Sequence, residues 1–302
     1  MLPPVDRLHR AISSALDLRV VVVTTTELVR EACRRHEIGG AEAVVLGRAL
    51  TAGCLLSTLS KSASERVRLE FRGDGPLGRI HVDSRGDGRV RGFLGRPGDA
   101  PPRPLPAAAA GRLRIGALVG EGALAITRDL DLENPYQGVV ALQSGEIDED
   151  LQHYLDHSEQ MPSALGCEVL LDAQGGVLRA AGVLAQTFPG GDTEVLDQVR
   201  ASIRDGALAD LLRQPREGDA LIGFALAGGP FEILGEHDLT FRCTCSPARA
   251  RAVLSLLGAD DLDALADEQG ATEVRCSFCG ERYQVPEAEL HDLAAEIRRE
   301  RS

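Results

Sequence analysis

The sequence lacks several features that mark common classes of protein. It has no Trp, only 3% aromatic residues and a single lysine, Lys61. No stretch reaches the roughly 18 apolar residues of a membrane span, and the N-terminal residues contain no uninterrupted apolar segment typical of a signal peptide. We therefore expect a soluble cytoplasmic protein with no membrane partner.

An excess of positive charge is also missing. The formal net charge is −13, and no long basic run is present. Nucleic acid binding depends on clustered Lys and Arg, so we expect no nucleic acid partner. Lys61 follows Ser60 rather than glycine, so the chain has no Walker A loop for ATP, and the glycine-rich stretches GDGPLG and RGDGRVRG are typical of hairpin turns.

The 302 residues allow about two domains, and 43% hydrophobic residues suffice for a packed core. Over residues 1–189 helical and strand patterns are mixed without regular alternation, which predicts an α+β core domain of helices and antiparallel sheet. The main expected elements, in order, are a buried strand at 18–25, helices at 25–36 and 41–61, a meander at 67–95, a Pro/Ala-rich loop at 97–111, strands near 112–127 and 138–143, a helix at 145–158 capped by Ser144, and a hairpin at 167–186.

The composition changes at the Phe-Pro-Gly-Gly sequence of residues 188–191. Residues 190–238 contain short amphipathic helical patterns, and helices this short are marginal unless they dock on a neighbour. We interpret 190–238 as a metastable helical linker. Residues 239–302 then form a small third unit, in which Ser246-Pro247 begins a helix, a strand–turn–strand follows, and a final helix ends the chain.

Four of the seven cysteines fall in this last unit. Cys243 and Cys245 form a Cys-x-Cys pair, and after 30 further residues Cys276 and Cys279 form Cys-x-x-Cys-Gly. Zn²⁺ prefers four thiolates in a tetrahedron, and the Cys-x-x-Cys-Gly turn directs two sulfurs to one side. We predict one four-thiolate zinc site. The remaining three cysteines, Cys33, Cys54 and Cys167, are expected to be buried free thiols.

A site with four protein ligands has no open position, so it should be structural or regulatory rather than hydrolytic. A disulfide across the single residue between Cys243 and Cys245 would be strained, and strained disulfides are the labile kind. Zinc supplies on the order of 10–16 kcal/mol to folding in zinc-finger peptides. Oxidation of the thiolates would remove that contribution and unfold the unit.

Other chemistry has weaker support. A thiol oxidoreductase would place Cys276-x-x-Cys279 at the start of a helix, whereas the pattern here is strand–turn–strand. His153 and His157 are one helical turn apart but are expected to lie on a solvated face. The acidic run Glu146, Asp148, Glu149 and Asp150 falls in the first turn of a helix, where the macrodipole favours carboxylates. We predict a capping role for it and no enzymatic activity.

Three segments resemble a known family, the redox-regulated heat-shock holdase chaperones (33 kDa chaperonin, HslO). FRCTCSPARARAVLSLLGADDLDALADEQGATEVRCSFCGERYQV is similar to the CxCS…EVxCxFCGxxY signature of the family, with the cysteines in register. LEFRGDGPLGRIHVDSRGDGRVRG and NPYQGVVALQSGEIDEDLQHYLDHSEQMPS resemble two further family segments, in the same order. SPARAR after Cys245 and the loop at 97–111 depart from the family pattern without affecting a metal ligand.

The resemblance implies an ATP-independent holdase that is inactive when reduced and zinc-bound. Oxidants would form the disulfides Cys243–Cys245 and Cys276–Cys279, release zinc, unfold the linker and allow binding of unfolding client proteins, typically as a homodimer. The alternative hypothesis is a constitutive zinc-ribbon module that binds protein without redox switching. Peroxide-triggered zinc release with gain of client binding would separate these hypotheses.

Overall fold

The computed structural model describes residues 5–58, 62–95, 112–129, 135–214 and 218–300. Lys61 and the Pro/Ala-rich segment at 97–111 lie outside these residues. The chain divides into two compact units, Met1–Arg242 and Cys243–Ser302. Helices are mixed with antiparallel sheet, so the predicted α+β class is confirmed.

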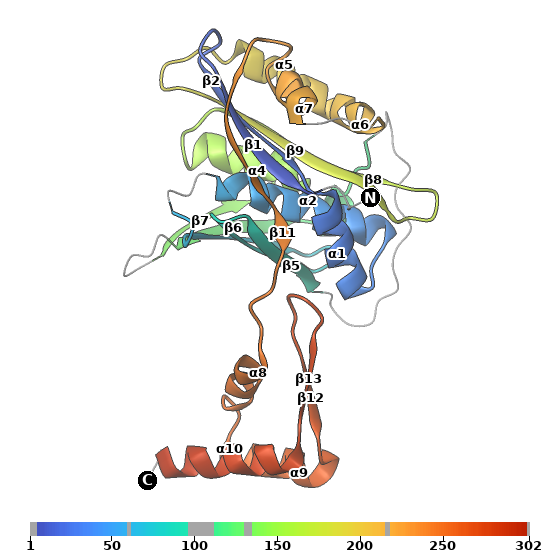
Figure 1. The fold of residues 1–302 in the computed structure, drawn as a ribbon, viewed down its shortest axis with the longest axis vertical. Helices are drawn as coiled ribbons and strands as arrows, with labels where there is room; N and C mark the ends of the chain where they lie inside the picture. The colour runs from blue at the N-terminus through green and yellow to red at the C-terminus, as the bar shows by residue number, and fades with distance from the viewer. Residues whose placement is uncertain (1–4, 59–61, 96–111, 130–134, 215–217, 301–302) are drawn as a thin grey trace. The chain divides into compact units, whose positions relative to one another are not determined.

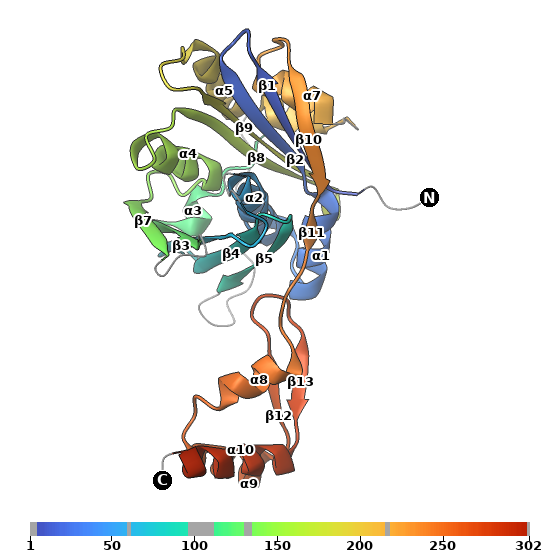
Figure 2. The ribbon, with the colours of Figure 1, turned by 60° about the vertical axis from the view of Figure 1, so that its left-hand side comes forward.

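One long helix, α2 (Gly40–Ser57), is the centre of the first unit. Seventeen of its 18 residues are buried, so the predicted helix at 41–61 is present as far as Ser57. It lies between two sheets, which contact it on opposite sides (Figures 1 and 2). Gly47 and Gly53 allow this close approach, because a Cβ atom at Gly47 would lie 2.8 Å from Val169 and one at Gly53 would lie 2.6 Å from Val82.

By length and composition alone α2 would also be long and apolar enough to cross a membrane. However, 94% of that segment is buried inside the protein, which is the environment of a core helix.

The first sheet has five strands in the order β10-β1-β2-β9-β8. All its pairings are antiparallel. Its strands are β1 (Arg7–Ser13), β2 (Leu18–Thr24), β8 (Ser163–Leu171), β9 (Val177–Thr187) and β10 (Glu232–Asp238). β2 confirms the buried strand predicted at 18–25, and β8 and β9 confirm the predicted hairpin. β1 was not predicted, because its residues RLHRAIS carry too few apolar side chains for a clear alternation.

The second sheet has six strands in the order β11-β5-β4-β3-β6-β7. Its strands are β3 (Arg66–Gly73), β4 (Arg79–Arg85), β5 (Arg89–Gly95), β6 (Gly122–Asp129), β7 (Tyr136–Ala141) and β11 (Thr240–Phe241). β3, β4 and β5 confirm the predicted meander, and its alternating residues Val67, Leu69 and Phe71 are buried. The strand expected near 112–127 begins only at Gly122, because a short helix, α3 (Gly116–Val119), precedes it.

Two further helices pack around α2 and the sheets. They are α1 (Thr26–His36) and α4 (Ile147–His157). Both were predicted, but the cap expected at Ser144 is wrong: the helix begins after Glu146, and Ser144 Oγ accepts the Glu146 N–H at 3.2 Å. The Ser144 hydroxyl therefore belongs to the turn that precedes the helix. In this turn Gly145 has a φ of +73° and redirects the chain.

Residues 194–225 form three helices that cover the outer face of the five-stranded sheet (Figure 1). They are α5 (Glu194–Arg204), α6 (Ala207–Leu212) and α7 (Gly218–Ala225). Their buried residues pack against small side chains such as Ala164, Ala181 and Val183. After these helices the chain forms strand β10, so the segment 190–238 is helical only in its first part.

The second unit contains three helices and one hairpin. Its elements are α8 (Pro247–Leu254), α9 (Ala259–Gln269), β12 (Thr272–Arg275), β13 (Arg282–Val285) and α10 (Glu287–Glu300). Ser246 caps α8 through the Arg249 N–H at 3.3 Å, as the Ser-Pro signal predicted. The core of this unit consists of nine buried apolar side chains, including Leu262, Leu290 and Ala294.

Candidate metal centre

The structure brings the four predicted cysteines together in the second unit. Cys243 and Cys245 precede α8, and Cys276 and Cys279 lie in the turn between β12 and β13. The four Sγ atoms all lie within 4.8 Å of one another. The Sγ atoms of Cys243 and Cys276 are 3.7 Å apart, and those of Cys245 and Cys279 are 3.3 Å apart. The cluster is a group that could hold one metal ion.

The Cys-x-x-Cys half is shaped by the backbone of its turn. The Cys276 N–H donates to Glu281 O at 2.8 Å, and the Gly280 N–H donates back to Cys276 O at 2.8 Å. Gly280 has a φ of +71°, a left-handed conformation that glycine adopts without strain. The N–H groups of Phe278 and Glu281 face the sulfurs of Cys276 and Cys279. The hairpin thereby fixes both sulfurs on the same side of the turn.

The Cys-x-Cys half is held differently. α8 begins at Pro247, and its cap at Ser246 fixes the chain directly after Cys245. The hydroxyl of Tyr283, on β13, donates a hydrogen bond to Cys245 Sγ at 3.0 Å. A side chain from the hairpin therefore positions a sulfur from the other half of the cluster.

The sulfur environment fits a bound cation. Burial raises the pKa of the Cys276 and Cys279 thiols, so without a positive charge these groups favour the neutral form. A cation at the centre reverses that preference and deprotonates coordinating thiols. Tetrahedral zinc with bonds of about 2.3 Å would set its sulfurs about 3.8 Å apart. The separations of 3.3 and 3.7 Å lie close to this value, and all four Sγ atoms lie within 4.8 Å of one another, so the cluster needs little rearrangement to coordinate the ion.

The other three cysteines are buried, as predicted. Cys33, Cys54 and Cys167 all lie within the first unit. Burial raises the pKa of the Cys33 thiol to about 12 and raises the pKa of the other two thiols as well. The thiolate is the reactive form of cysteine, so these three side chains are poor candidates for redox chemistry.

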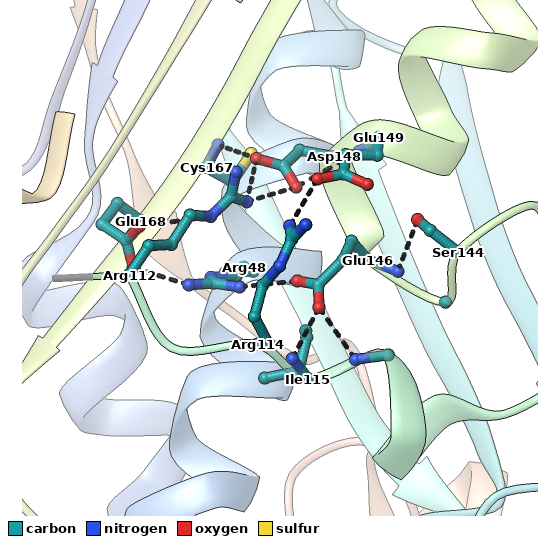
Figure 3. Close-up of polar contacts among 12 residues, drawn as sticks. Arg48, Arg112, Arg114, Ile115, Ser144, Glu146, Asp148, Glu149, Cys167 and Glu168 are labelled. Atoms are coloured by element: carbon teal, nitrogen blue, oxygen red, sulfur yellow. Dashed lines mark hydrogen bonds and ion pairs between the residues drawn. The ribbon is translucent and has the colours of Figure 1, made fainter. Parts of the chain in front are cut away.

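A cluster of buried charges in the first unit was missed by the sequence analysis (Figure 3). Arg48, from the middle of α2, is fully buried and pairs with Glu146 at 3.1 Å and Glu168 at 2.8 Å. Arg112 pairs with Asp148 at 2.6 Å. The acidic run 146–150 is therefore more than a helix cap, because several of its carboxylates neutralise arginines inside the protein.

Backbone groups complete this charge cluster. Glu146 Oε1 accepts the N–H groups of Ile115 and Gly116 at 2.7 and 2.9 Å, and Asp148 Oδ2 accepts the Cys167 N–H at 3.0 Å. Burial raises the pKa of Asp148, but Arg112 and Arg48 outweigh burial and hold this pKa below its ordinary value. The sequence signal for the cluster was Arg48 itself, the one arginine of a largely apolar helix, because a buried charge requires a partner.

The histidine pair expected on a solvated face shows no metal-like geometry among the described residues. The rings of His153 and His157 lie 4.1 Å apart and tilted, and His157 Nδ1 pairs with the carbonyl of His153. Cys276-x-x-Cys279 lies between two strands and not at the start of a helix, as predicted.

Comparison with known proteins gives a consistent result. The Hsp33 protein family profile matches residues 6–286. The chain is 39% identical over 290 residues to the 33 kDa chaperonin of Geobacter sulfurreducens, covering 95% of this chain and 94% of that protein. It is 38% identical to the 33 kDa chaperonin of Thermus thermophilus, and this match covers 97% of this chain and 87% of that protein. These relatives are named as chaperonins rather than as enzymes.

A solved structure matches nearly the whole length of the chain. The crystal structure of the 33 kDa chaperonin (heat shock protein 33 homolog) from Thermotoga maritima superposes with a TM-score of 0.85 at 29% identity. The superposition covers 97% of this chain and 99% of the Thermotoga maritima chain. The match therefore extends through the four-cysteine unit.

Proposed function

Because this chain belongs to the Hsp33 protein family, we propose that it is a redox-regulated, ATP-independent holdase chaperone. The observation that carries the redox part is the cluster of four sulfurs within 4.8 Å of one another. In the proposed resting state Cys243, Cys245, Cys276 and Cys279 hold one Zn²⁺ as thiolates. The protein acts in the cytoplasm, where reducing conditions keep these cysteines in the thiolate state.

The proposed switch is the oxidation of these thiolates to two disulfides, Cys243–Cys245 and Cys276–Cys279. As each disulfide forms, its two thiolates transfer two electrons to one peroxide molecule. The peroxide takes up two protons and leaves as two water molecules. The sulfur contacts of 3.7 and 3.3 Å join the two halves of the cluster, whereas the proposed bonds form within each half. The sulfurs must therefore change neighbours as the metal is released.

Loss of the metal would remove most of the stability of the second unit. Among the described residues its core cluster has nine buried apolar side chains, three of which are alanines. A bound zinc ion contributes on the order of 10–16 kcal/mol in peptides of this class. A core this small cannot replace such a contribution, so we expect the unit to unfold once the disulfides form.

Unfolding of the linker would then uncover a client surface. The buried faces of α5, α6 and α7 contribute side chains such as Leu196, Val199 and Leu221, each at most 2% exposed. Under them lies an outer sheet face lined by Val20, Val22 and other small apolar residues. Separation would expose both surfaces, and exposed apolar patches of this kind bind unfolding chains without sequence specificity. The active form is proposed to be a homodimer.

The alternative function is a constitutive zinc ribbon that binds protein without a switch. The same four sulfurs would serve it equally well. Residues 243–302 contain 12 acidic residues and seven arginines, so the second unit disfavours nucleic acid in either case.

One titration separates the two functions. Reduced, zinc-loaded protein is treated with hydrogen peroxide at mildly elevated temperature, zinc is followed with a chromogenic chelator, and aggregation of a denatured client is followed by light scattering. We expect zinc release and suppression of aggregation to rise together. Zinc release without any suppression of aggregation would contradict the holdase, and suppression that is independent of oxidation would favour the constitutive ribbon.

A further inference from the structure

The four sulfurs of the metal centre receive different hydrogen bonds. Cys276 and Cys279 lie in the hairpin turn, where the N–H groups of Phe278 and Glu281 face their sulfurs. A Cys-x-Cys segment is too short to form the same turn. Cys245 receives instead the hydroxyl of Tyr283, with an O···Sγ distance of 3.0 Å.

The ring of Tyr283 is fixed by the same hairpin. Tyr283 lies directly opposite Val274 in the β12–β13 pair, so both side chains are on one face of the hairpin. Val274 in turn packs against the core of the second unit. The hydroxyl therefore connects the hairpin, which carries Cys276 and Cys279, to a sulfur that is 38 residues distant in sequence.

Hydrogen bonding to a metal-bound thiolate has two chemical effects. It orients the ligand and strengthens the site, as outer-shell partners of metal ligands do. It also withdraws electron density from sulfur, and the nucleophilicity of a thiolate falls with its basicity. The reaction with peroxide begins with attack of sulfur on oxygen, so this donor should slow oxidation at Cys245.

We propose that Tyr283 is a positioning residue that restrains Cys245, and so sets the amount of oxidant needed to open the metal centre. This inference rests on the proposed redox function. In the restrained step the Cys245 thiolate attacks peroxide, the O–O bond breaks, and sulfenic acid and hydroxide form. The Cys243 thiolate then attacks the Cys245 sulfur, the S–O bond breaks, a second hydroxide leaves, and the disulfide is complete.

The test compares Tyr283→Phe with the full-length wild-type protein. Phenylalanine keeps the ring against Val274 and removes only the hydroxyl. Tyr136→Phe is the matched control, because Tyr136 is on β7 of the first unit with 52% of its surface exposed. The rate of zinc release is measured at several peroxide concentrations and plotted against the peroxide concentration. The slope reports attack by sulfur, and the intercept reports spontaneous loss of metal.

We expect Tyr283→Phe to raise the slope several-fold, because Cys245 Sγ loses the hydroxyl donor that lies 3.0 Å from it. Affinity for zinc should fall about tenfold, as for other outer-shell substitutions. With Co²⁺ in place of zinc, the thiolate-to-cobalt absorption should shift in Tyr283→Phe and not in Tyr136→Phe.

Two results would overturn the role of Tyr283 alone: an unchanged slope, or a rise confined to the intercept, which would indicate only a looser fold. A wild-type protein that binds zinc but keeps it at every peroxide concentration would instead contradict the proposed redox function, and the role of Tyr283 with it.

Discussion

The two units of this chain are stabilised by different means. In the first, a helix buried on nearly every side lies between two sheets, and even the charges of Arg48 and Glu168 are neutralised inside the protein. In the second, a core of nine side chains supports four clustered sulfurs, and apolar residues such as Leu256 remain 84% exposed. Packing stabilises the first unit, whereas the second is proposed to depend on a bound metal ion that oxidation would remove. A single polypeptide can therefore lose order in one part while the other part persists.

The largest expected effect tests this contrast directly. Removal of the metal with a strong chelator under reducing conditions should unfold residues 243–302, because it takes away on the order of 10–16 kcal/mol. Hydrogen exchange measured by mass spectrometry should show fast exchange in α8, α9 and α10, while amides of α2 stay protected. Equal loss of protection in both units would contradict the proposed difference in stabilisation.

A buried charge offers the reciprocal experiment in the first unit. Arg48→Met removes the arginine that pairs with both Glu146 and Glu168, and breaking a buried ion pair in this way costs about 3–5 kcal/mol. We expect a lower midpoint of denaturant unfolding for the first unit, with unchanged zinc affinity in the second. Arg114→Met is a suitable control, because Arg114 pairs with Glu149 at a site where 55% of its own side chain is exposed.

The linker can be weakened without touching either centre. Leu196 on α5 is completely buried in the layer between the helices and the five-stranded sheet. Leu196→Ala should destabilise helix docking by about 2–4 kcal/mol through the lost contacts and the cavity left behind. If linker release activates the protein, the variant should suppress client aggregation at a lower peroxide concentration than wild type. Leu178→Ala, at an exposed position on β9, should leave the peroxide requirement unchanged.

The effect of Asp6 on the pH dependence of stability should be confined to the first unit. Asp6 is buried, and burial raises its pKa to about 6, although its Oδ2 atom accepts the Leu28 N–H at 2.6 Å. A raised carboxyl pKa stabilises the folded state at low pH, and this contribution is lost as pH rises from about 4 through 6. The total is about 3 kcal/mol for a difference of roughly two pKa units.

Asp6→Asn removes this titration. The unfolding free energy of wild type relative to Asp6→Asn should therefore decrease across this pH interval, as measured by hydrogen exchange of α2 amides. A pH-independent difference between the two proteins would show that Asp6 has an ordinary pKa. Zinc affinity of the second unit should be the same in both proteins at each pH.

The sequence predicted the cluster of four cysteines because much of its geometry is local. Cys276 and Cys279 belong to one turn, and the strand patterns on both sides determine where that turn lies. The capping signal at Ser246 likewise fixes the start of α8 next to Cys245. Only the approach of the two halves required long-range packing, and the preference of metals for four thiolates already indicated it.

The buried charge cluster could not be predicted in the same way. Arg48, Arg112, Asp148 and Glu168 come from four separate parts of the chain, and only the packing of α2, α4 and β8 brings them together. Periodicity showed that α2 is buried but not which carboxylates meet its arginine. Strand β10 was missed for a related reason, because five of its seven residues are exposed and its place is set by backbone pairing with β1.

That pairing has a consequence for what the molecule presents to other chains. β10 is an edge strand of its sheet and bears Glu232, Glu236 and Asp238. Charged side chains on an edge strand discourage two sheets from pairing edge to edge. The neighbouring strand, β1, carries Arg7 and His9. These side chains pair with Glu236 and Asp238 at 3.3 to 3.5 Å. If β10 separated from the sheet, β1 would become the edge strand. The edge would then be basic instead of acidic, and the backbone N–H and C=O groups of β1 would lose their hydrogen-bond partners. A surface that repels extended acidic segments would become one that attracts them.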